Sequence, residues 1–598
     1  MQNGSNTGLP KWDLTPVYKG FDDPEFVNDR KNYNSGTANF LSRAGDTGAA
    51  ASNPEKWLEW IVSEYNRLSD LFENLISYTY CRFSTATTDP EATRMLNALE
   101  AEGLPLRNGI VVLRNTLAGI QGLDEIIQGS EILSEYQFFF TEQLTLQQYQ
   151  MPPALENLGA DLSRPGGDAW SRMQESISST LACTWDEESG EQKTINELRG
   201  LAFHSDRDVR EKAYIHEIEL WKSMEIPMAY SLNGVKGFTD ILNSRRGYER
   251  TLDKSIFQAR IDSASLNSLI SAMENSLPMF RKYLKAKAQL LGIEKCAFYD
   301  IFAPVGKSGK TWSFAEAKEL IIKEFTAFSQ ELGAFAKEAF DKSWIDAEPR
   351  KGKVGGAYCI SLPLPGESRI LCNFDGSFSS LTTVAHELGH AFHHHVLKDD
   401  SAVHREYPMT LAETASIFSE TLVFNGALKH LEGEERIQVL ETFLADSTQV
   451  IVDILSRYYF ENQVMNKRKQ GELSPREFSD LMIEAQKKTY GDGLDQDKLH
   501  QYMWAVKGHY YRQELAFYNF PYAFGQLFGL GLYSLYLNNQ ESFPEIYNTV
   551  LKQTGNTDAV SLCKSVGFDI RSQGFWDKGI KAIENYVDEF TKLVSERV

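Results

Sequence analysis

The sequence predicts a mainly α-helical globular protein with a small β-sheet. Apolar residues recur at helical spacing through most of the 598 residues, whereas runs of β-prone residues occur at only two places. Apolar residues make up 42% of the chain and charged residues 24%, which is an ordinary globular composition and argues against disorder. A chain of this length can bury a large core without disulfides or a structural metal.

The first strong helix signal is Asn53-Pro54, a capping residue followed by a proline suited to the first turn. Trp57, Ile61 and Leu68 then recur on one face of the expected helix. Similar amphipathic stretches predict helices near residues 92–120, 123–150, 206–245, 264–292, 313–342, 431–466 and 475–488. The uncharged stretch 515–540 has the length of a membrane span, but its Asn, Gln, Pro and Gly residues favour a buried helix.

Two segments predict short β-hairpins. The clearer one is 354–374, where two β-prone runs flank the turn residues 363–366. The second is 178–195, around a polar turn. Composition does not change sharply along the chain, and the softest boundary lies near residues 196–205. We therefore expect a helical region at 1–198 followed by a larger domain at 199–598.

Charge and cysteine content exclude several classes of function. Lys and Arg number 61 against 82 Asp and Glu, so the net charge of −21 lacks the basic footprint of a nucleic-acid-binding protein. The six cysteines are scattered without a C-x-x-C pair, as is typical of a reducing compartment. The first 16 residues have neither the basic nor the apolar region of a signal peptide. We expect a cytoplasmic protein that binds no nucleic acid and no membrane; the sequence leaves its oligomeric state open.

The most informative string is an HExxH motif at residues 386–390. On a helix, His386 and His390 lie one turn apart on the same face, where two imidazoles can bind one Zn²⁺. Glu387 projects beside them and can accept a proton from the attacking water. The alternative is a helix with incidental histidines, which the helical context makes less favourable.

The residues around this motif fit a packed helix. Ser379 and Ser380 offer N-caps ahead of it. Three further histidines, His393, His394 and His395, follow it, and we expect them to be solvated or to support the metal ligands. The motif therefore has a plausible helical setting but still needs a third ligand.

Glu413 is the candidate for that third ligand. It lies in the segment 410–420, which we expect to form a second helix packed against the first. The alternative is a capping box, in which Glu413 reaches back to Thr410. Glu420 lies two helical turns further on, so it can hydrogen-bond a ligand histidine from behind.

A family resemblance becomes specific at this point. HELGHAFH at 386–393 followed by AETASIFSE at 412–420 resembles the oligoendopeptidase F branch of the thimet oligopeptidase family of zinc peptidases. SDRDVREKAY (205–214) and RRGYER (245–250) also resemble landmarks of that family. The resemblance implies a closed helical bowl around a deep substrate channel, and we expect the small sheet predicted at 354–374 to lie next to the HExxH helix. It covers residues 200–590 well and the N-terminal third more weakly, so 199–598 would be the catalytic domain.

The resemblance also implies roles for individual residues. His386, His390 and Glu413 would hold one Zn²⁺ per chain, and Glu387 would be the general base. In that family a histidine and tyrosines near the C-terminus contact the substrate and the transition state. The residues that match them here are His509 and Tyr522 as catalytic residues, with Tyr518 as a weaker candidate. The thimet branch has Gly-Gly-Tyr shortly after the histidine, whereas this chain has Arg-Gln-Glu at 512–514, so the middle tyrosine has no direct match.

The hairpin at 354–374 predicts a place for the substrate backbone. An extended peptide could pair with its edge as an extra strand, which would explain tolerance for many sequences. Gly355 and Gly356 would allow close approach, and Ala357 and Tyr358 continue the strand. The alternative is an ordinary structural hairpin.

Together these features predict a zinc metalloendopeptidase that hydrolyses internal bonds of short unstructured peptides. One alternative is a helical HExxH exopeptidase of the carboxypeptidase type, which would need a fixed charge to hold a peptide terminus. No motif in the sequence identifies such a charge. The other alternative is a catalytically silent peptide-binding protein, against which the intact Glu387 argues.

Overall fold

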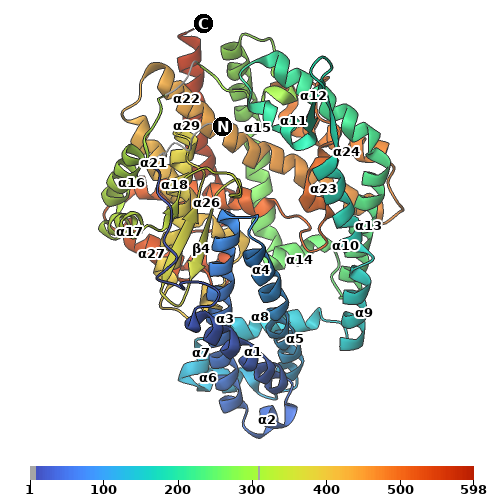
Figure 1. The fold of residues 1–598 in the computed structure, drawn as a ribbon, viewed down its shortest axis with the longest axis vertical. Coiled ribbons are helices and arrows are strands. Elements are labelled where there is room, and N and C mark those ends of the chain that lie inside the picture. The colour runs from blue at the N-terminus through green and yellow to red at the C-terminus, as the bar shows by residue number, and fades with distance from the viewer. Residues whose placement is uncertain (1–7, 307–309, 598) are drawn as a thin grey trace. The chain divides into compact units, whose positions relative to one another are not determined.

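The structure is a computed structural model that describes residues 8–306 and 310–597. The chain divides into two compact units, each drawn from three stretches of sequence. Unit 1 comprises residues 1–149, 310–429 and 535–567, and unit 2 comprises residues 150–309, 430–534 and 568–598. Helices dominate both units (Figure 1), which confirms the mainly α-helical class. The closed bowl and the domain boundary after residue 198 stay predictions.

Unit 1 contains the N-terminal helices and the helices around the HExxH motif. Its helices are α1 (Pro24–Ala44), α2 (Thr47–Ser52), α3 (Pro54–Thr85), α4 (Pro90–Glu102), α5 (Leu104–Ala118), α6 (Leu123–Gly129), α7 (Glu131–Ser134), α8 (Gln137–Gln148), α16 (Phe314–Phe328), α17 (Gln330–Asp341), α18 (Phe378–Leu397), α19 (Ala402–Arg405), α20 (Met409–Ala412), α21 (Thr414–Leu428), α27 (Phe543–Lys552) and α28 (Ala559–Ser565).

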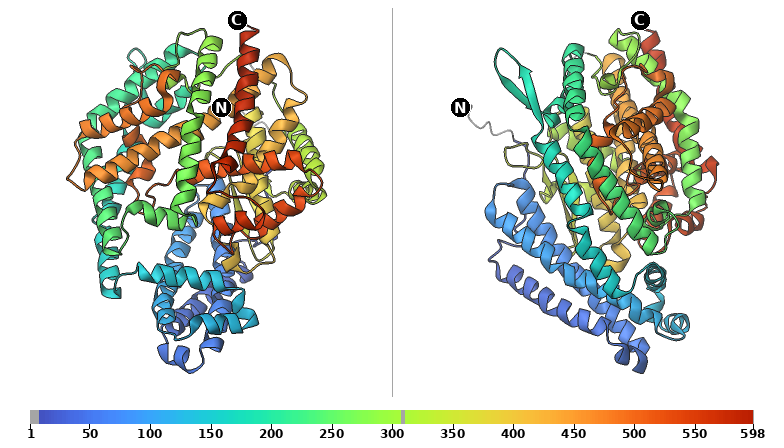
Figure 2. Two further views of the ribbon diagram at one scale, coloured as in Figure 1. Left: turned by 180° about the vertical axis from the view of Figure 1, so that it is seen from behind. Right: turned by 90° about the vertical axis from the view of Figure 1, so that its right-hand side faces the viewer.

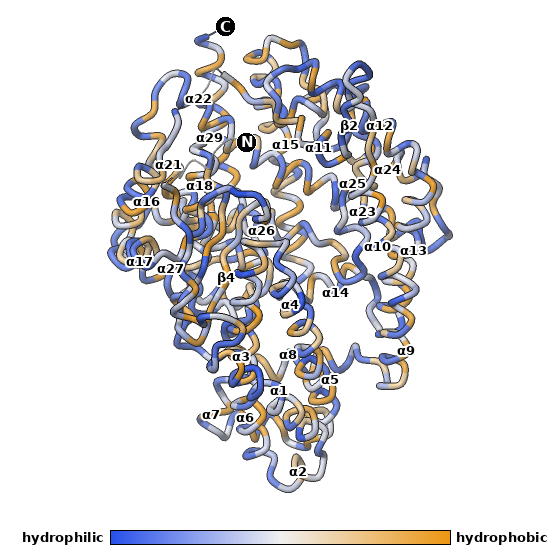
Figure 3. Tube along the Cα trace, in the orientation of Figure 1, coloured by the Kyte–Doolittle hydropathy of each residue, from blue (hydrophilic) through white to orange (hydrophobic). Residues whose placement is uncertain are grey.

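The long helix α3 begins where the sequence predicts. The Asn53 side chain accepts a hydrogen bond from the backbone N–H of Lys56, and Pro54 occupies the first turn. Its apolar face, which includes Trp57 and Ile61, is buried in a core shared with α1, α5 and α8. In Figure 3 hydrophobic and hydrophilic residues alternate along the helices, as packing of one face requires.

The sheet of unit 1 has three strands in the order β3–β5–β4. β3 (Ile345–Asp346) is parallel to β5 (Glu367–Leu371), and β4 (Tyr358–Leu362) is antiparallel to β5. β4 and β5 are the hairpin that the sequence predicts, and both pack against α18. The small sheet therefore lies next to the HExxH helix, with β4 at its edge.

Unit 2 is also built mainly from helices, with one small hairpin. Its elements are α9 (Pro153–Ser163), α10 (Gly167–Thr180), β1 (Ala182–Asp186), β2 (Glu191–Thr194), α11 (Ile195–Gly200), η1 (Leu201–Phe203), α12 (Arg207–Ser223), α13 (Glu225–Arg245), α14 (Thr251–Gln258), α15 (Ser263–Leu291), η2 (Phe298–Asp300), α22 (Gly433–Thr448), η3 (Gln449–Asp453), α23 (Ile454–Arg468), α24 (Pro475–Tyr490), η4 (Gly491–Gly493), α25 (Met503–Val506), η5 (Gly508–Tyr511), α26 (Phe520–Asn538) and α29 (Gln573–Ser595). The end of α26, residues 535–538, falls in unit 1.

Unit 2 contains a continuous helical run, a pair of long helices and a hairpin. α22, η3 and α23 follow one another without a break, and η3 is a π-helical turn, a feature that occurs often at functional sites. α15 and α29 lie side by side (Figure 2). β1 pairs with β2 as the second predicted hairpin.

The uncharged stretch 515–540 forms a buried helix rather than a membrane span. α26 covers residues Phe520 to Asn538, and most of its side chains are buried. The preceding residues 512–519 are not helical, so the helix is shorter than the uncharged stretch. Within residues 8–306 and 310–597, no helix carries an apolar stretch long enough to cross a membrane.

Candidate functional site

The HExxH motif lies in the middle of α18, as predicted. The helix begins two residues earlier than expected, because the hydroxyl of Ser377, rather than Ser379 or Ser380, caps it by accepting from the N–H of Ser380. The Asp375 carboxylate accepts a hydrogen bond from the Ser377 N–H and fixes the turn before it. His386 and His390 then project from one face of α18.

Gly389, inside the motif, sets the distance between α18 and α21. A Cβ atom at this position would lie 2.5 Å from the carbonyl oxygen of Ala415 and 2.7 Å from the Cα of Ser416. No other residue therefore fits without a shift of one helix backbone. The missing side chain lets α21 pack closely on α18 and brings Glu413 next to the two histidines.

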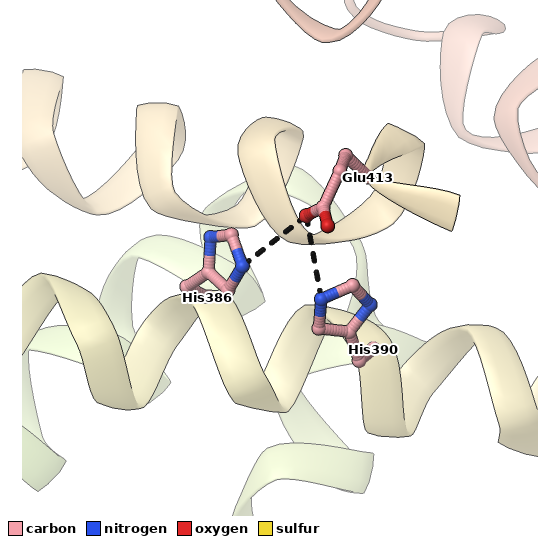
Figure 4. A group of neighbouring side chains, drawn as sticks. All are labelled: His386, His390 and Glu413. Carbon is pink, nitrogen blue, oxygen red and sulfur yellow. Dashed lines mark ion pairs between the residues drawn. The ribbon is translucent and has the colours of Figure 1, made fainter. Parts of the chain in front are cut away.

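Glu413 stands at a break between two helices. α20 ends at Ala412 and α21 begins at Thr414, so the single helix expected at 410–420 is interrupted at the carboxylate. Thr410 lies inside α20 rather than at a cap, which removes the capping-box alternative. The side chain of Glu413 instead points at His386 and His390 (Figure 4).

The distances between these three side chains fit a metal ion. The Nε2 atoms of His386 and His390 lie 3.3 and 3.4 Å from the same carboxylate oxygen, Oε2 of Glu413. Two ligands bound tetrahedrally to zinc at about 2.0–2.1 Å are separated by about 3.3–3.4 Å. A direct charge-assisted hydrogen bond would be shorter, about 2.7–2.9 Å. The spacing therefore suits three ligands of one metal ion.

The three side chains are also partly open to solvent. His386 is 24% exposed, His390 18% and Glu413 17%. Structural zinc sites are closed by a fourth protein ligand, whereas catalytic sites keep one position open. Among the described residues, His386, His390 and Glu413 are the one group with metal-binding spacing. Two histidines, one carboxylate and an open side are the features of a catalytic metal site.

Neighbouring side chains fix the orientation of His386 and Glu413. Nδ1 of His386 lies 3.1 Å from Oε2 of Glu420, as the sequence predicts. Because a carboxylate only accepts, Nδ1 carries the proton and Nε2 is left facing Glu413. The hydroxyl of Ser416 donates to Oε2 of Glu413 at 2.7 Å and holds that carboxylate.

The carboxylates change the protonation behaviour of the histidine. Burial alone would lower the pKa of His386, but its hydrogen bonds to Glu413 and Glu420 outweigh burial and raise the pKa. Burial would likewise raise the pKa of Glu413, but His386 and His390 hold it well below its ordinary value. The pair of carboxylates thus supplies negative charge that a divalent cation would balance.

Glu387 meets the requirements of a general base. It is only 6% exposed, and burial raises the pKa of its carboxyl, an effect that His386 and His390 partly offset. None of the described residues donates a hydrogen bond to its carboxylate. The group can therefore take up a proton without first breaking a contact.

The prediction for the histidines after the motif was partly wrong. His393 is fully buried, and its ring stacks on Tyr407 while Nε2 lies 2.9 Å from the hydroxyl of Thr554. It neither meets solvent nor supports a ligand, because α27 and the segment after it cover this face of α18. Nδ1 of His394 lies 3.2 Å from the hydroxyl of Ser368 on β5.

The predicted peptide-binding strand lies at the sheet edge. Gly355 and Gly356 are exposed, and a Cβ at either would meet open space. Gly356 has a φ of +78°, which glycine adopts readily, and the amide of Asn373 donates to its carbonyl oxygen at 3.0 Å. Ala357 is half-buried. The hydroxyl of Tyr358 lies 2.6 Å from the hydroxyl of Ser84, so the side chain of Tyr358 has a structural role. Any role of Tyr358 in binding falls to its backbone.

The C-terminal candidates lie together in unit 2. His509 is in η5, and its ring centroid lies 5.9 Å from that of Tyr518. The hydroxyls of Tyr518 and Tyr522 are hydrogen-bonded to each other. Tyr510 and Tyr511 are fully buried in the core of unit 2, which is the packing role that the sequence left open for them.

Sequence reasoning missed the residues that support these side chains. Gly389 and Ser416 were quoted within the motifs without a role. Asp453 and Arg457 carry opposite charges four residues apart within a largely buried segment, and that pattern was a usable signal. Arg457 reaches His509 through Asn519, which only the structure could reveal.

Family models place the chain among peptidases. A model described as peptidase family M3 matches residues 201–582, and a model described as oligopeptidase F matches residues 120–182. The chain is 25% identical over 414 residues to Oligopeptidase PepF of Bacillus subtilis, covering 68% of this chain and 61% of that protein. It is also 25% identical to the chromosomal Oligoendopeptidase F of Lactococcus lactis subsp. cremoris over 411 residues, 68% of this chain and 67% of that one.

Solved structures share the fold. A protein from Chlamydophila abortus superposes with a TM-score of 0.81 at 21% identity, over 98% of each chain. Oligoendopeptidase-F from Enterococcus faecium superposes with a TM-score of 0.69 at 17% identity, over 96% of this chain and 99% of that one. At these identities the likeness concerns the fold alone.

Proposed function

Because the chain belongs to peptidase family M3, we propose that it is a zinc-dependent oligoendopeptidase that hydrolyses internal bonds of short, unstructured peptides. The observation that carries the proposal is the cluster of His386, His390 and Glu413 at ligand spacing, with Glu387 beside it. The family supplies the reaction class, and the donor set supports zinc as the metal, since two imidazoles and one carboxylate are a frequent catalytic zinc set.

The proposed roles at the metal follow from the contacts above. His386, His390 and Glu413 would hold the ion, with Glu420 and Ser416 orienting them. A bound Zn²⁺ supplies a Lewis acid that polarises the peptide carbonyl and lowers the pKa of water. Co²⁺ or Mn²⁺ could bind the same donors, so the metal present depends on availability as well as affinity.

Glu387 would move the proton in the reaction. Its carboxylate takes a proton from the attacking water as the new C–O bond forms. It then gives that proton to the leaving amine as the C–N bond breaks, so the carboxylate is regenerated. The absence of a hydrogen-bond donor to Glu387 among the described residues supports this role.

The edge of β4 would bind the substrate backbone. Among the described strands β4 pairs with β5 alone, so alternate backbone groups of its outer edge are available to an extended peptide. Gly355 and Gly356 leave space for a second backbone, and Ala357 and Tyr358 would continue the pairing. Backbone pairing does not read side chains, which fits a peptidase of broad sequence tolerance.

His509 and Tyr522 would donate hydrogen bonds to the carbonyl oxygen that gains negative charge during the reaction, with Tyr518 as a secondary contact. Such donors typically contribute 10²–10³-fold to turnover. The hydroxyl pair of Tyr518 and Tyr522 supports a shared role, because one hydroxyl donates to the other and orients it. His509 is partly exposed and therefore accessible to a substrate.

We also propose a catalytic domain at 199–598 with a helical region at 1–198 ahead of it, and a cytoplasmic location. The match of the M3 model to residues 201–582 supports the first point. The six cysteines are all unpaired, which supports a reducing compartment.

An internally quenched peptide blocked at both ends tests the function. The zinc-loaded protein should cleave it, since an endopeptidase needs no free terminus, whereas an exopeptidase would leave it intact. Glu387→Gln should retain zinc but lose about 10²–10⁴-fold in kcat, because the amide cannot accept the proton. No cleavage by the wild type, or normal turnover in E387Q, would contradict the proposal. Glu319→Gln, at an exposed position on α16, is the matched control and should behave as wild type.

A further inference from the structure

A chain of hydrogen bonds in unit 2 ends on the ring of His509. Within α22–η3–α23, the guanidinium of Arg457 is ion-paired with Asp453, four residues before it. The same guanidinium donates from Nη1 to Oδ1 of Asn519 at 2.9 Å. The amide nitrogen of Asn519 then lies 2.7 Å from Nε2 of His509. Asp453, Arg457 and Asn519 are all at least nine-tenths buried.

The donor and the acceptor in each of these hydrogen bonds follow from the chemistry of the side chains. A guanidinium has donors only, so the Asn519 group that faces Arg457 must be its oxygen. The other end of the amide is therefore the NH₂ group, which can only donate. Nε2 of His509 must accept that hydrogen bond and so cannot carry a proton. In the neutral ring the proton consequently lies on Nδ1.

The surroundings of His509 keep the ring neutral. Burial lowers its pKa to about 2, and the nearby cations Arg457, Lys236 and Lys507 add to the effect. The aromatic neighbours Tyr510 and Tyr518 offer no negative charge. A protonated Nε2 would also place two donors against each other at the Asn519 amide.

The turn that carries Asn519 is itself held by a second buried ion pair. Phe517 has a φ of +55°, a left-handed conformation that costs a non-glycine residue about 1–3 kcal/mol. Its backbone N–H donates to the carboxylate of Glu461 at 3.0 Å, and Glu461 is paired with Lys236. Buried ion pairs are weak sources of stability, so two of them converging on residues 517–519 are better explained by positioning.

We propose that Arg457 and Asn519 are positioning residues that hold His509 as its Nδ1–H tautomer, so that Nδ1 donates a hydrogen bond to the substrate. This inference rests on the proposed peptidase function, in which His509 contacts the substrate. Nδ1 has no hydrogen-bond partner among the described residues, and the ring is only partly buried. The tautomer therefore turns its single donor towards the open side of the ring.

Two possible roles of Asn519 predict different behaviour of His509. If Asn519 only filled space, the proton could sit on either ring nitrogen, and a carboxylate in its place would change little beyond stability. If Asn519 fixes the tautomer, Asn519→Asp reverses the pattern, because its carboxylate would accept from Arg457 and from Nε2–H of His509 alike. Nε2 would then be protonated in the variant, and Nδ1 would lose its proton whenever the ring is neutral.

The first measurement is the ¹⁵N NMR spectrum of histidine-labelled, zinc-loaded full-length enzyme without substrate. Signals of His509 are assigned by their loss in His509→Gln. We expect a neutral ring protonated on Nδ1 and unprotonated on Nε2. A ring protonated on Nε2, alone or together with Nδ1, would overturn the proposal without any variant having to fold.

The second measurement is the same spectrum and the kinetics of N519D. We expect a ring protonated on Nε2, a kcat lower by about 10²–10³-fold at neutral pH and little change in KM, since one donor to the developing negative charge is lost. The ratio of N519D to wild-type kcat should rise as the pH falls, because protonation of the ring restores Nδ1–H. An unchanged tautomer, or a ratio independent of pH, would contradict the proposal.

Two controls keep the outcomes distinct. Asn466→Asp places the same charge on the exposed face of α23 and should leave tautomer and kcat unchanged. The tautomer is read without substrate, so it does not depend on hydrolysis. If the wild type cleaves no peptide but His509 is the Nδ1–H tautomer, the peptidase function fails while the assignment of Arg457 and Asn519 as positioning residues stands.

Discussion

His386 in unit 1 and His509 in unit 2 have opposite electrostatic surroundings. His386 has two carboxylates within 3.3 Å, Glu413 and Glu420, and their hydrogen bonds raise its pKa against the effect of burial. His509 has an amide and cations around it, which lower its pKa to about 2 together with burial. In both rings one nitrogen is tied to a neighbour and the other is left for function. The tied nitrogen is Nδ1 in His386 and Nε2 in His509.

The difference shows that the partner of the tied nitrogen decides what the other nitrogen can do. A carboxylate accepts from Nδ1–H of His386 and leaves Nε2 as a basic lone pair, which suits a metal. An amide donates to Nε2 of His509 and leaves Nδ1–H as a neutral donor, which suits a carbonyl oxygen. Sequence motifs identify the histidine in each case but not which of its ring nitrogens carries the proton.

Metal removal should have the largest effect on turnover, and it should change the surroundings of His386 and His390 but not those of His509. A chelator such as 1,10-phenanthroline is expected to abolish turnover, and added Zn²⁺ should restore it. The imidazole ¹⁵N signals of His386 and His390 should change on chelation, while those of His509 should not. Turnover that survives complete removal of the metal, measured by elemental analysis, would contradict the assignment.

Glu217, a buried carboxylate beside His500, offers a test of pH-dependent stability within unit 2. Burial would raise the pKa of Glu217, but Arg199 and His500 outweigh it and lower the pKa to about 2. The folded pKa lies below the unfolded value, so the stabilisation is fully present above about pH 4.5 and is lost as the pH falls towards 2. We expect Glu217→Gln to be less stable by roughly 3 kcal/mol at pH 7, with the gap narrowing in acid. Chemical unfolding at several pH values measures this, and a gap that does not change with pH would refute it.

Glu420→Gln tests the carboxylate behind His386. The amide can still accept from Nδ1–H but brings no negative charge, so metal affinity should fall about 10–100-fold. Competition with a zinc chelator of known affinity measures the change. Glu319→Gln, which removes an exposed carboxylate of the same unit, should leave the affinity unaltered. Equal affinities for E420Q and wild type would show that the charge of Glu420 does not matter.

Gly389→Ala tests the close approach of α18 and α21. The new Cβ would meet the backbone of α21 at 2.5 Å, so the helices must separate. We expect a loss of about 1–3 kcal/mol in unfolding free energy, together with weaker metal binding as Glu413 moves away. Gly129→Ala, at the end of α6 where a Cβ meets open space, is the control for a glycine substitution in the same unit. If G389A binds the metal with unchanged affinity, the distance between α18 and α21 does not determine the position of Glu413 at the metal.

The sequence was sufficient for the elements whose signals are local. Helix α3, the hairpin β4–β5 and the HExxH helix follow from capping residues, periodicity and a motif with fixed spacing. The contacts of Glu413 and Glu420 with the histidines were also predicted, although the helix expected to carry both carboxylates is interrupted at Glu413. These features depend on residues close in sequence or on a motif whose chemistry is known.

The remaining features depend on contacts that no local pattern encodes. Gly389 permits two backbones to meet, and only the position of α21 makes that visible. His393 was expected to be solvated or to support a ligand, but the residue that accepts or donates at its ring, Thr554, lies far away in the sequence. The link from Arg457 through Asn519 to His509 joins α23, a strained turn and η5, and each part looks ordinary by itself.

The most direct test of the central claim, that His386, His390 and Glu413 hold one zinc ion, is anomalous diffraction from crystals of the zinc-loaded enzyme above and below the zinc edge. One peak is expected at about 2.0–2.1 Å from Nε2 of each histidine and from a carboxylate oxygen of Glu413. A metal bound by other residues, or no anomalous peak between these three side chains in enzyme that cleaves peptides, would contradict the account.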